Sequence, residues 1–524
     1  MKTYLAITIG PIYQTFSIAR HTREVWGASY IFSYIAKGII LKLIDSNIKI
    51  NAQVDFEKQI KSSVKKFVLP NIGSDKLFST KSSAGLFPDN IIVEADILGN
   101  RNFEEIRNAV IKELSNEIAE AIGKDLKDVK KFLNDYLRIL HRILTVDRPI
   151  LDVTPSINLA EQEPFFATQI RQNYLSDFFK TINNKKNGFM KSRGIQRFES
   201  LVEIATIELR EKAPQKYNKL VNQYLWNDIV DIDSDGEFIK ALSSKEGFAD
   251  DFKTYHKYIA VVLVDGDKIG ATLKGIHDPN VVKQFSEKLL NWAIEMDKLL
   301  NAWKAKAIYI GGDDLLFFAP IVNHQSVNIF DLAKQIDDKF NEQNWEELET
   351  KEKPTLSFGI SITYYKYPLI EALETAKSLL RKAKDAGGDQ LAIRFLKHSG
   401  AELPFTLNKN DVCFDNIFKD MDASSKETKS LLSRVSYKIR ENEPVFEIMG
   451  KDETRMKEIF KNVFEEVDCE DPSKKPKPKD YYLKSLRELM VREYKNADVE
   501  TAHKQVFSLT RAIKFIKGLD ELKD

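Results

Sequence analysis

The stretch Ala-Ile-Tyr-Ile-Gly-Gly-Asp-Asp-Leu-Leu-Phe-Phe-Ala, residues 307–319, says most about the fold and the function of this chain. Apolar runs flank Gly311, Gly312, Asp313 and Asp314, which predicts a β-hairpin with two glycines and two carboxylates at its tip. Carboxylates at such a tip are suited to hold a divalent metal ion. Because Gly and Asp are also ordinary turn residues, the motif alone is explained equally well by a solvated turn.

A second acidic cluster upstream favours the metal site. The run YIAVVLV at 258–264 has the length and β-branched content of a buried strand, and DGDKIG follows at 265–270. A carboxylate at the end of a buried strand, followed by glycines that let backbone N–H groups approach a ligand, is suited to bind metal and phosphate. A structural turn needs only one of these features, so the two clusters together indicate nucleotide chemistry.

The segment around these clusters has the element order of a ferredoxin-like, palm-type domain. After the strand at 258–264, the patterns predict a helix over 281–303, the hairpin, a helix over 326–343, a strand over 355–365, a helix over 368–386 and an edge strand over 391–396. We expect Asp265 to lie on the strand next to the hairpin.

The N-terminal segment predicts a similar α+β unit. Its expected elements are a strand over 4–9, a helix over 26–43, strands at 66–70 and 90–97, and a helix over 103–122. The openings of the two units match in pattern from Tyr4 and from Tyr258, which places Pro11 where the other unit has Asp265. The first unit is therefore expected to lack the ligand and to be catalytically silent.

Helical patterns dominate the other segments, and the predicted fold class is α+β with two ferredoxin-like palm domains, helical inserts and a C-terminal helical bundle. The basic loop 185–194 is best explained as solvated surface. Beyond 403 the pattern is helical, interrupted by a Pro/Lys linker at 471–480 and followed by helices over 481–496 and 499–518. The expected domains are 1–124 (non-catalytic palm), 125–250 (helical), 251–402 (catalytic palm) and 403–524 (helical).

Composition excludes several classes of protein. The 524 residues suggest roughly three or four domains. The 79 basic and 78 acidic residues nearly balance, so net charge gives no sign of nucleic-acid binding. The only cysteines, Cys413 and Cys469, cannot form a four-cysteine zinc site, and no zinc is expected. The N-terminus lacks a signal peptide and no apolar run is long enough to span a bilayer, so we expect a soluble, cytoplasmic protein with no membrane partner.

The acidic clusters suit nucleotidyl transfer assisted by two Mg²⁺ or Mn²⁺ ions. Asp265 and Asp314 are the first choices as ligands that bridge the two metal ions, and the Gly266 carbonyl completes one of the two sites. Asp267 and Asp313 are expected either to be further ligands or to support the ligands from behind. Lys384, at the end of a helix, would meet the triphosphate, although most lysines are simply exposed. The residues expected to contact the nucleotide are Gly266, Asp267, Lys268, Gly270, Gly311, Gly312 and Lys384.

Other catalytic motifs are missing. His277-Asp278 is the only His-Asp pair, and a turn or a helix N-cap explains it better than a nuclease site does. No HExxH or GxxxxGK[ST] motif occurs, which excludes those metalloprotease and Walker-type classes.

Four separated patterns resemble the large subunit of type III CRISPR RNA-targeting complexes, Cmr branch. They are the opening GPIYQTFSIARHTREVWGASYIFSYIA, the strand ending in DGDKIG, the hairpin IYIGGDDLLFF, and SFGISITYYKYPLIEALETAKSLLRKAK, and they occur in the family's order. LFPDN at 86–90 resembles a turn of the family. The resemblance covers most of residues 1–400.

The resemblance implies a cyclase-like palm that, once the complex has captured target RNA, polymerises ATP into a cyclic oligoadenylate messenger or joins AMP to an acceptor such as S-adenosylmethionine. Asp313 and Asp314 match the family's paired acidic residues, Asp265 its metal aspartate and Lys384 its phosphate-contacting lysine. The implied partners are guide CRISPR RNA, target RNA, other Cmr-type subunits and ATP.

The chain departs from the family pattern in three ways. It starts at the first palm strand, so the family's HD nuclease domain is expected to be absent. The cysteines of a zinc site between the palms are missing, and Gly388 stands where related diguanylate cyclases place an arginine. Two alternatives stay open: a catalytically silent scaffold that holds guide RNA and partner subunits, and a stand-alone diguanylate cyclase, which DGD and GGDD disfavour.

Overall fold

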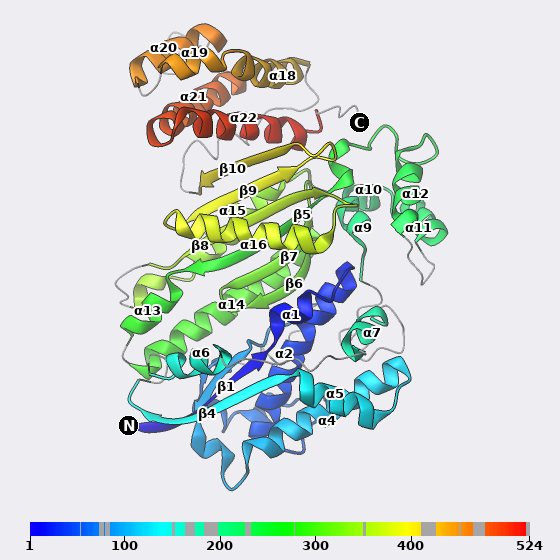
Figure 1. The fold of residues 1–524 in the computed structure, drawn as a ribbon, viewed down its shortest axis with the longest axis vertical. Coiled ribbons are helices and arrows are strands. Elements are labelled where there is room, and N and C mark those ends of the chain that lie inside the picture. The colour runs from blue at the N-terminus through cyan, green and yellow to red at the C-terminus, as the bar shows by residue number, and fades with distance from the viewer. Residues whose placement is uncertain are drawn as a thin grey trace. The chain divides into compact units, whose positions relative to one another are not determined.

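The computed structural model of the chain has two compact units (Figure 1). Unit 1 is Met1–Leu201, Val264–Phe318 and Ile336–Leu356, and unit 2 is Val202–Leu263, Ala319–Gln335 and Ser357–Asp524. The four-domain division expected from the sequence stays a prediction. The residues that the structure describes are 1–52, 54–72, 78, 84–148, 152–162, 173–182, 198–225, 232–276, 278–348, 353–409, 426–449, 452–464 and 477–519.

The first sheet has four strands in the spatial order β2-β3-β1-β4, of which Figure 1 labels β1 and β4. They are β1 (Lys2–Gly10), β2 (Phe67–Leu69), β3 (Asn90–Glu94) and β4 (Arg138–Val146). The central strand β1 pairs antiparallel with β3 and β4. With α2 (Thr22–Ile44) after β1 and α4 (Phe103–Ile122) after β3, this is the ferredoxin-like arrangement that the sequence predicted.

β4 lies in a segment, 125–250, whose sequence pattern predicted helices. It pairs with β1 from Val146 opposite Lys2 to Arg138 opposite Gly10 and completes the sheet. Because β4 is an edge strand with several exposed side chains, it lacks the strict alternation that marks a half-buried strand. Ile143 is 51% exposed although it is apolar, which hides the period of two.

α2 is the central helix of unit 1. Its length and a mean hydropathy of 1.3 would let it cross a membrane, but 89% of that 18-residue window is buried inside the fold. It packs against β1, α4, α7 (Tyr174–Lys180) and β6 (Lys306–Gly311), so its apolar residues belong to the core. The other helical elements here are α1 (Ile12–Phe16), α5 (Leu126–Tyr136), α6 (Thr154–Gln162), α7 (Tyr174–Lys180), η1 (Phe56–Ile60), η2 (Val64–Lys66) and η3 (Ala95–Leu98).

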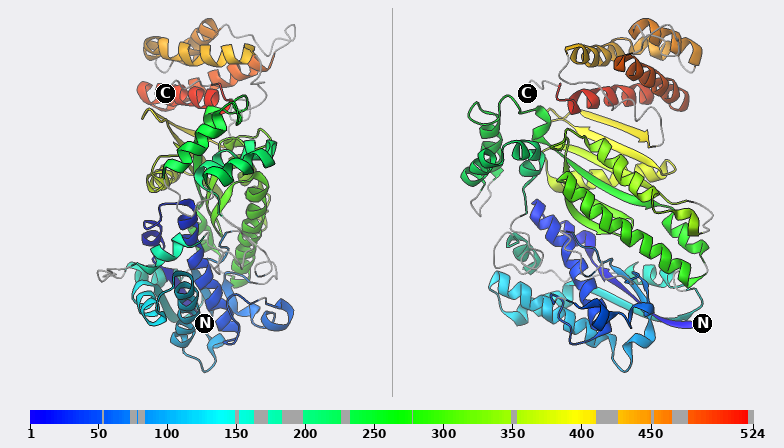
Figure 2. Two further views of the ribbon diagram at one scale, coloured as in Figure 1. Left: turned by 90° about the vertical axis from the view of Figure 1, so that its right-hand side faces the viewer. Right: turned by 180° about the vertical axis from the view of Figure 1, so that it is seen from behind.

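The second sheet has six strands in the order β10-β9-β8-β5-β7-β6; Figure 1 labels these strands, and the right-hand view of Figure 2 shows the sheet from behind. They are β5 (Tyr258–Asp267), β6 (Lys306–Gly311), β7 (Asp314–Pro320), β8 (Thr355–Tyr364), β9 (Gln390–Leu396) and β10 (Glu402–Asn408). The order β8-β5-β7-β6 repeats that of β4-β1-β3-β2, so both sheets share the ferredoxin-like topology. The associated helices are α13 (Ile269–Gly275), α14 (Pro279–Trp303), α15 (Ile329–Asn341), η5 (Trp345–Leu348) and α16 (Leu369–Asp385).

The strand β10 corrects two expectations. β9 pairs parallel with β8 and antiparallel with β10, so β9 is an inner strand and β10 forms the edge. The chain just beyond residue 403 is therefore extended and not helical. The sequence ELPFTLN alternates as a strand should, but Pro404 lowered its strand character, and proline is tolerated in edge strands.

The C-terminal helices pack on this edge of the second sheet within unit 2. α22 (Val499–Ile516) lies against β10, where Gln505 Nε2 donates to the Thr406 carbonyl at 3.1 Å. α21 begins at Pro478, inside the predicted linker, whose residues 471–476 lie outside the described part. The helices are α18 (Lys426–Glu441), α19 (Glu443–Met449), α20 (Glu453–Phe464), α21 (Pro478–Asn496) and α22, and they confirm the predicted helical bundle.

A smaller helical cluster in unit 2 surrounds the fully buried Tyr217, with Phe238 and Phe248 beside it. Its elements are α9 (Leu201–Ala205), α10 (Ile207–Lys212), α11 (Pro214–Tyr224), α12 (Ile232–Ser243) and η4 (Thr254–Lys257). The basic loop 185–194, Cys413 and Cys469 lie outside the described residues.

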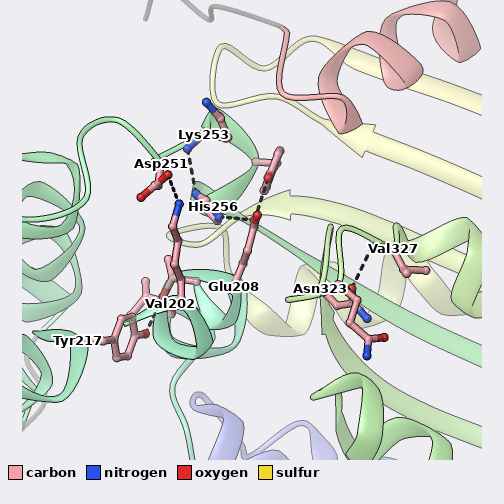
Figure 3. A network of polar contacts seen from close by, with 12 residues as sticks. Val202, Glu208, Tyr217, Asp251, Lys253, His256, Asn323 and Val327 are labelled. Atoms are coloured by element: carbon pink, nitrogen blue, oxygen red, sulfur yellow. Dashed lines mark hydrogen bonds and ion pairs between the residues drawn. The ribbon is translucent and has the colours of Figure 1, made fainter. Parts of the chain in front are cut away.

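A buried polar network joins α10 to η4, just before β5 (Figure 3). His256 is fully buried; its Nδ1 accepts from the Lys253 backbone N–H at 2.9 Å, so the ring proton is on Nε2, which lies 3.0 Å from Glu208 Oε2. The Tyr255 hydroxyl also donates to Glu208 Oε2, at 2.8 Å. Because Nδ1 faces a donor, this network accommodates a neutral imidazole only.

This network predicts a pH dependence of stability. Burial lowers the pKa of His256 below its ordinary value of 6.5, and this effect outweighs the opposing effect of Glu208. Below pH 6.5 the unfolded chain therefore binds a proton at His256 that the folded chain does not bind. The free energy of unfolding should then fall by up to about 1.4 kcal/mol per pH unit below 6.5. We expect His256→Gln, which cannot titrate, to show a shallower fall between pH 6.5 and 5.5 in urea unfolding. Equal slopes for both proteins would contradict this prediction.

Candidate metal and nucleotide site

The hairpin predicted at 307–319 is present. β6 and β7 pair antiparallel, with Gly311 opposite Asp314 and the two-residue turn Gly312-Asp313 between them. Gly312 has φ of 66°, a left-handed conformation that favours glycine. Glycine in the first central position of a two-residue turn is typical of a type II′ hairpin, whose twist matches that of the strands. The motif therefore has a local structural reason as well as a chemical one.

Three carboxylates meet at this turn. One oxygen each of Asp265, Asp313 and Asp314 lies within 4.8 Å of the others, and none of the three residues is fully buried. Asp265 belongs to β5, which neighbours β7 in the sheet, as expected from the sequence. β5 continues to Asp267, so Asp265 lies inside the strand and not at its end. All three residues are in unit 1.

The donor set fits a hard divalent cation. Three carboxylates this close repel one another, and a cation between them removes that repulsion. Oxygen donors are the ligands that Mg²⁺ and Mn²⁺ prefer, and zinc sites more often use sulfur or nitrogen. Within the described part of the chain, this is the one cluster of three or more acidic, His or Cys side chains with such spacing.

Gly266 makes room for one of these carboxylates. A Cβ at position 266 would stand 2.5 Å from Asp313 Oδ2 and 2.9 Å from Asp313 Cβ. It would also stand 2.5 Å from Cγ1 of Ile269. The Asp313 side chain therefore lies directly over the Cα of Gly266, which gives this glycine a steric role that its sequence pattern did not specify.

Asp267 is separate from the three-carboxylate cluster. Its side chain is 5% exposed and accepts a hydrogen bond from Thr355 Oγ1 at 2.8 Å. This contact joins the end of β5 to the start of β8 and accounts for a buried carboxylate. Thr355 was not among the residues expected from the sequence, because a threonine at the start of a strand carries no special signal. A nucleotide-binding role for Asp267 stays a prediction.

A single residue, Lys268, connects β5 to α13. Lys268 is exposed and has φ of 60°, which is uncommon for a residue with a side chain. Gly270, in α13, has nothing within 4 Å of a Cβ built on it, so no packing contact requires glycine there. Non-glycine residues in this conformation cluster at functional sites, where the surroundings hold them. Nucleotide contacts by both residues stay predictions.

Gly311 is covered by a neighbouring ring. A Cβ at Gly311 would stand 1.8 Å from the hydroxyl oxygen of Tyr309, two residues earlier on β6. The Tyr309 ring thus lies across the first glycine of the motif, and only glycine leaves space for it. A tyrosine inside a strand carries no special signal in the sequence, so Tyr309 was not among the predicted site residues.

The remaining expected residues are placed elsewhere. Lys384 lies in the last turn of α16, in unit 2, and its contact with the triphosphate stays a prediction. Asp278 is the N-cap of α14, where its carboxylate accepts from the Asn280 N–H at 2.8 Å, as its sequence context indicated. His277 lies outside the described residues. In the first sheet, β1 ends at Gly10, and the following Pro11 has no carboxylate to offer a metal ion.

Comparisons with known proteins identify relatives of both sheet-containing regions. The family model described as Cas10/Cmr2, second palm domain, matches residues 258–392, which include the hairpin and Asp265. The model described as CRISPR-associated protein Cmr2, N-terminal, matches residues 4–125. The two matches fall on the two ferredoxin-like sheets.

The CRISPR system Cmr subunit Cmr2 of Pyrococcus furiosus is 32% identical over 176 residues, which cover 28% of this chain. The match spans 19% of the length of that relative. Among solved structures, a chain of type III-B Cmr-beta bound to cognate target RNA superposes with a TM-score of 0.57 at 11% identity, over 92% of this chain and 80% of that one. At this identity the likeness is one of fold.

Proposed function

The chain belongs to the Cas10/Cmr2 family, and from that premise we propose that it is the nucleotidyltransferase subunit of a type III CRISPR complex of the Cmr branch. On binding of target RNA, it would use ATP to make an adenylate second messenger for antiviral defence. The product would be a cyclic oligoadenylate or an AMP conjugate such as that of S-adenosylmethionine. Its proposed partners are guide RNA, target RNA, the other Cmr-type subunits and ATP, in the cytoplasm.

The observation that carries the proposal is the cluster of Asp265, Asp313 and Asp314 at the tip of a palm hairpin. In the proposed reaction, a 3′-hydroxyl oxygen forms a bond to the α-phosphorus of ATP while the bond from that phosphorus to the β-bridging oxygen breaks. Pyrophosphate leaves, and the hydroxyl proton passes to water. Two Mg²⁺ or Mn²⁺ ions bound at this cluster would neutralise charge on the attacking oxygen, the α-phosphate and the leaving group.

The chain's own residues have distinct proposed roles. Asp265 and Asp314 come from neighbouring strands and would hold both ions between them, with the Gly266 carbonyl completing one site. Asp313, whose side chain packs on Gly266, would complete the cluster. The residues that would contact the nucleotide are Gly266, Asp267, Lys268 and Gly270 after the metal strand, Gly311 and Gly312 of the hairpin, and Lys384 as a point charge for the triphosphate.

Mass spectrometry of the products tests this function. We expect the assembled complex, given target RNA, ATP and Mg²⁺, to release pyrophosphate together with an adenylate product. Parallel reactions with and without S-adenosylmethionine identify the acceptor, because a conjugate and an oligoadenylate differ in mass. A complex that binds target RNA but leaves ATP unconsumed under both conditions would contradict the proposal and favour a silent scaffold.

A further inference from the structure

The edge strand of the second sheet is held by a segment of the N-terminal region, in the same compact unit. Ala84–Phe87 runs just before β3, and Gly85 forms a parallel bridge to Tyr309 of β6. The Ile310 N–H points at the Gly85 carbonyl, with 3.4 Å between nitrogen and oxygen. β6 is the last strand of its sheet, so this bridge pairs backbone groups that an edge strand otherwise leaves open.

Gly85 itself is packed against α2. A Cβ at Gly85 would stand 2.5 Å from Cβ and 2.9 Å from Oγ of Ser33, which is 3% exposed. Ser33 Oγ also accepts a hydrogen bond from the Phe87 N–H at 3.0 Å. The short segment is thus confined between a core helix on one side and β6 on the other, and only glycine at position 85 fits between them.

A second contact fastens the beginning of β6 to the same helix. Lys306 Nζ lies 2.9 Å from Glu199 Oε2, and both side chains are mostly buried, with 24% and 19% exposed. Thr22 Oγ1, in the first turn of α2, donates to the Glu199 backbone carbonyl at 2.7 Å. α2 also packs directly on β6. The strand is therefore anchored at its start and again near its middle.

These anchors lie next to the metal ligands along the chain. The register of β6 against β7 shifts between Ala307 and Tyr309, a bulge at the residues beside the Gly85 bridge. The Tyr309 ring covers Gly311, and Gly311 pairs with Asp314. Tyr309 therefore lies two residues from the carboxylate turn and touches its first glycine, and bulges are common next to functional sites, where they aim side chains.

We propose that Gly85 and Ser33 are positioning residues for the metal site: by clamping β6 at Tyr309, the N-terminal palm-like region sets the spacing of Asp313 and Asp314 from Asp265. This inference rests on the proposed function of that site. It makes the non-catalytic region a structural part of the catalytic one, so that changes at the contact of Ser33 with Gly85 alter metal binding without touching a ligand.

Mn²⁺ binding to the purified full-length chain, measured by calorimetry, tests the inference. Gly85→Ala should raise the Kd for Mn²⁺ at least about tenfold, the lower range for residues that orient metal ligands. The double variant Gly85→Ala with Ser33→Gly should recover affinity to the level of Ser33→Ala alone: the clash is gone, because the nearest remaining atom of residue 33, Cα, is 3.9 Å away, but the hydrogen bond from the Phe87 N–H is lost as well. Gly85→Ala with Ser33→Ala should not recover affinity, since Cβ remains. Ser33→Ala alone, which introduces no clash, should weaken binding several-fold.

A matched control separates positioning from general destabilisation. Gly38 lies five residues after Ser33 on the same helix, α2, but its Cα faces Ile50 and Val110 and not Gly85. Gly38→Ala places a Cβ 2.7 Å from Ile50 Cδ1 and should lower the thermal midpoint while leaving the Mn²⁺ Kd unchanged. If Gly85→Ala and Ser33→Ala both bind Mn²⁺ like wild type, the positioning role of Gly85 and Ser33 is overturned. The same holds if Gly38→Ala loses as much affinity as Gly85→Ala. Neither result bears on the metal site itself. A wild-type chain that binds no Mn²⁺ overturns the metal site and, with it, both proposals.

Discussion

The double substitution Asp313→Asn with Asp314→Asn should abolish formation of the adenylate product while the complex still assembles. Asparagine keeps the size and one oxygen of each side chain but removes two negative charges from a cluster whose oxygens lie within 4.8 Å. Loss of metal stabilisation worth several kcal/mol slows the reaction by roughly a thousandfold or more. Product formation by reconstituted complexes, with target RNA and ATP, measures the effect.

The control for this substitution removes the same charge elsewhere. Asp250 and Asp338 are both exposed, and the pair Asp250→Asn with Asp338→Asn should leave product formation unchanged. Target-RNA binding and subunit assembly should match wild type in all variants, because the turn needs glycine at 312 and not the two carboxylates. Wild-type product levels from the Asp313/Asp314 variant would show that the reaction, if present, uses another site.

The sequence predicted those parts of the fold whose periodicity is strong. The buried strand YIAVVLV and the apolar flanks of the hairpin became β5, β6 and β7 in adjacent positions, because uninterrupted β-branched runs have few alternatives. β4 and β10 were missed. Both are edge strands, one with exposed apolar and basic residues and one containing Pro404, so neither shows a clear period of two.

The residues of the candidate site also fall into two groups, those that the sequence predicted and those that it did not. Asp265, Asp313 and Asp314 were named from local motifs, and the structure brings them together because sheet order places β5 beside β7. The roles of Thr355, Ser33 and Gly85 depend on contacts between segments distant in the chain: Thr355 is 88 residues from Asp267, and Phe87 is 54 residues from Ser33. No local pattern announces such contacts, so one sequence does not reveal them.

Gly266→Ala should weaken metal binding without removing any ligand. The new Cβ would stand 2.5 Å from Asp313 Oδ2 and 2.9 Å from Asp313 Cβ, distances that force the carboxylate away from Asp265 and Asp314. Because Asp313 Cβ is one bond from the backbone of a tight turn, rotation of the side chain cannot relieve the contact. We expect the Kd for Mn²⁺ to rise between about tenfold and a hundredfold, the range for residues that orient metal ligands.

Two further variants identify the contact that matters. Gly266→Ala also meets Ile269 Cγ1 at 2.5 Å, and adding Ile269→Ala removes that clash while the one with Asp313 remains. Mn²⁺ affinity should therefore stay low in the double variant, whereas recovery would assign the effect to the start of α13. Gly236→Ala makes the same chemical change 3.2 Å from the flexible tip of Lys366 and should bind Mn²⁺ like wild type. If Gly236→Ala weakened Mn²⁺ binding as much as Gly266→Ala, the added methyl group would act by lowering the stability of the protein. The contact between residue 266 and Asp313 would then not be the cause.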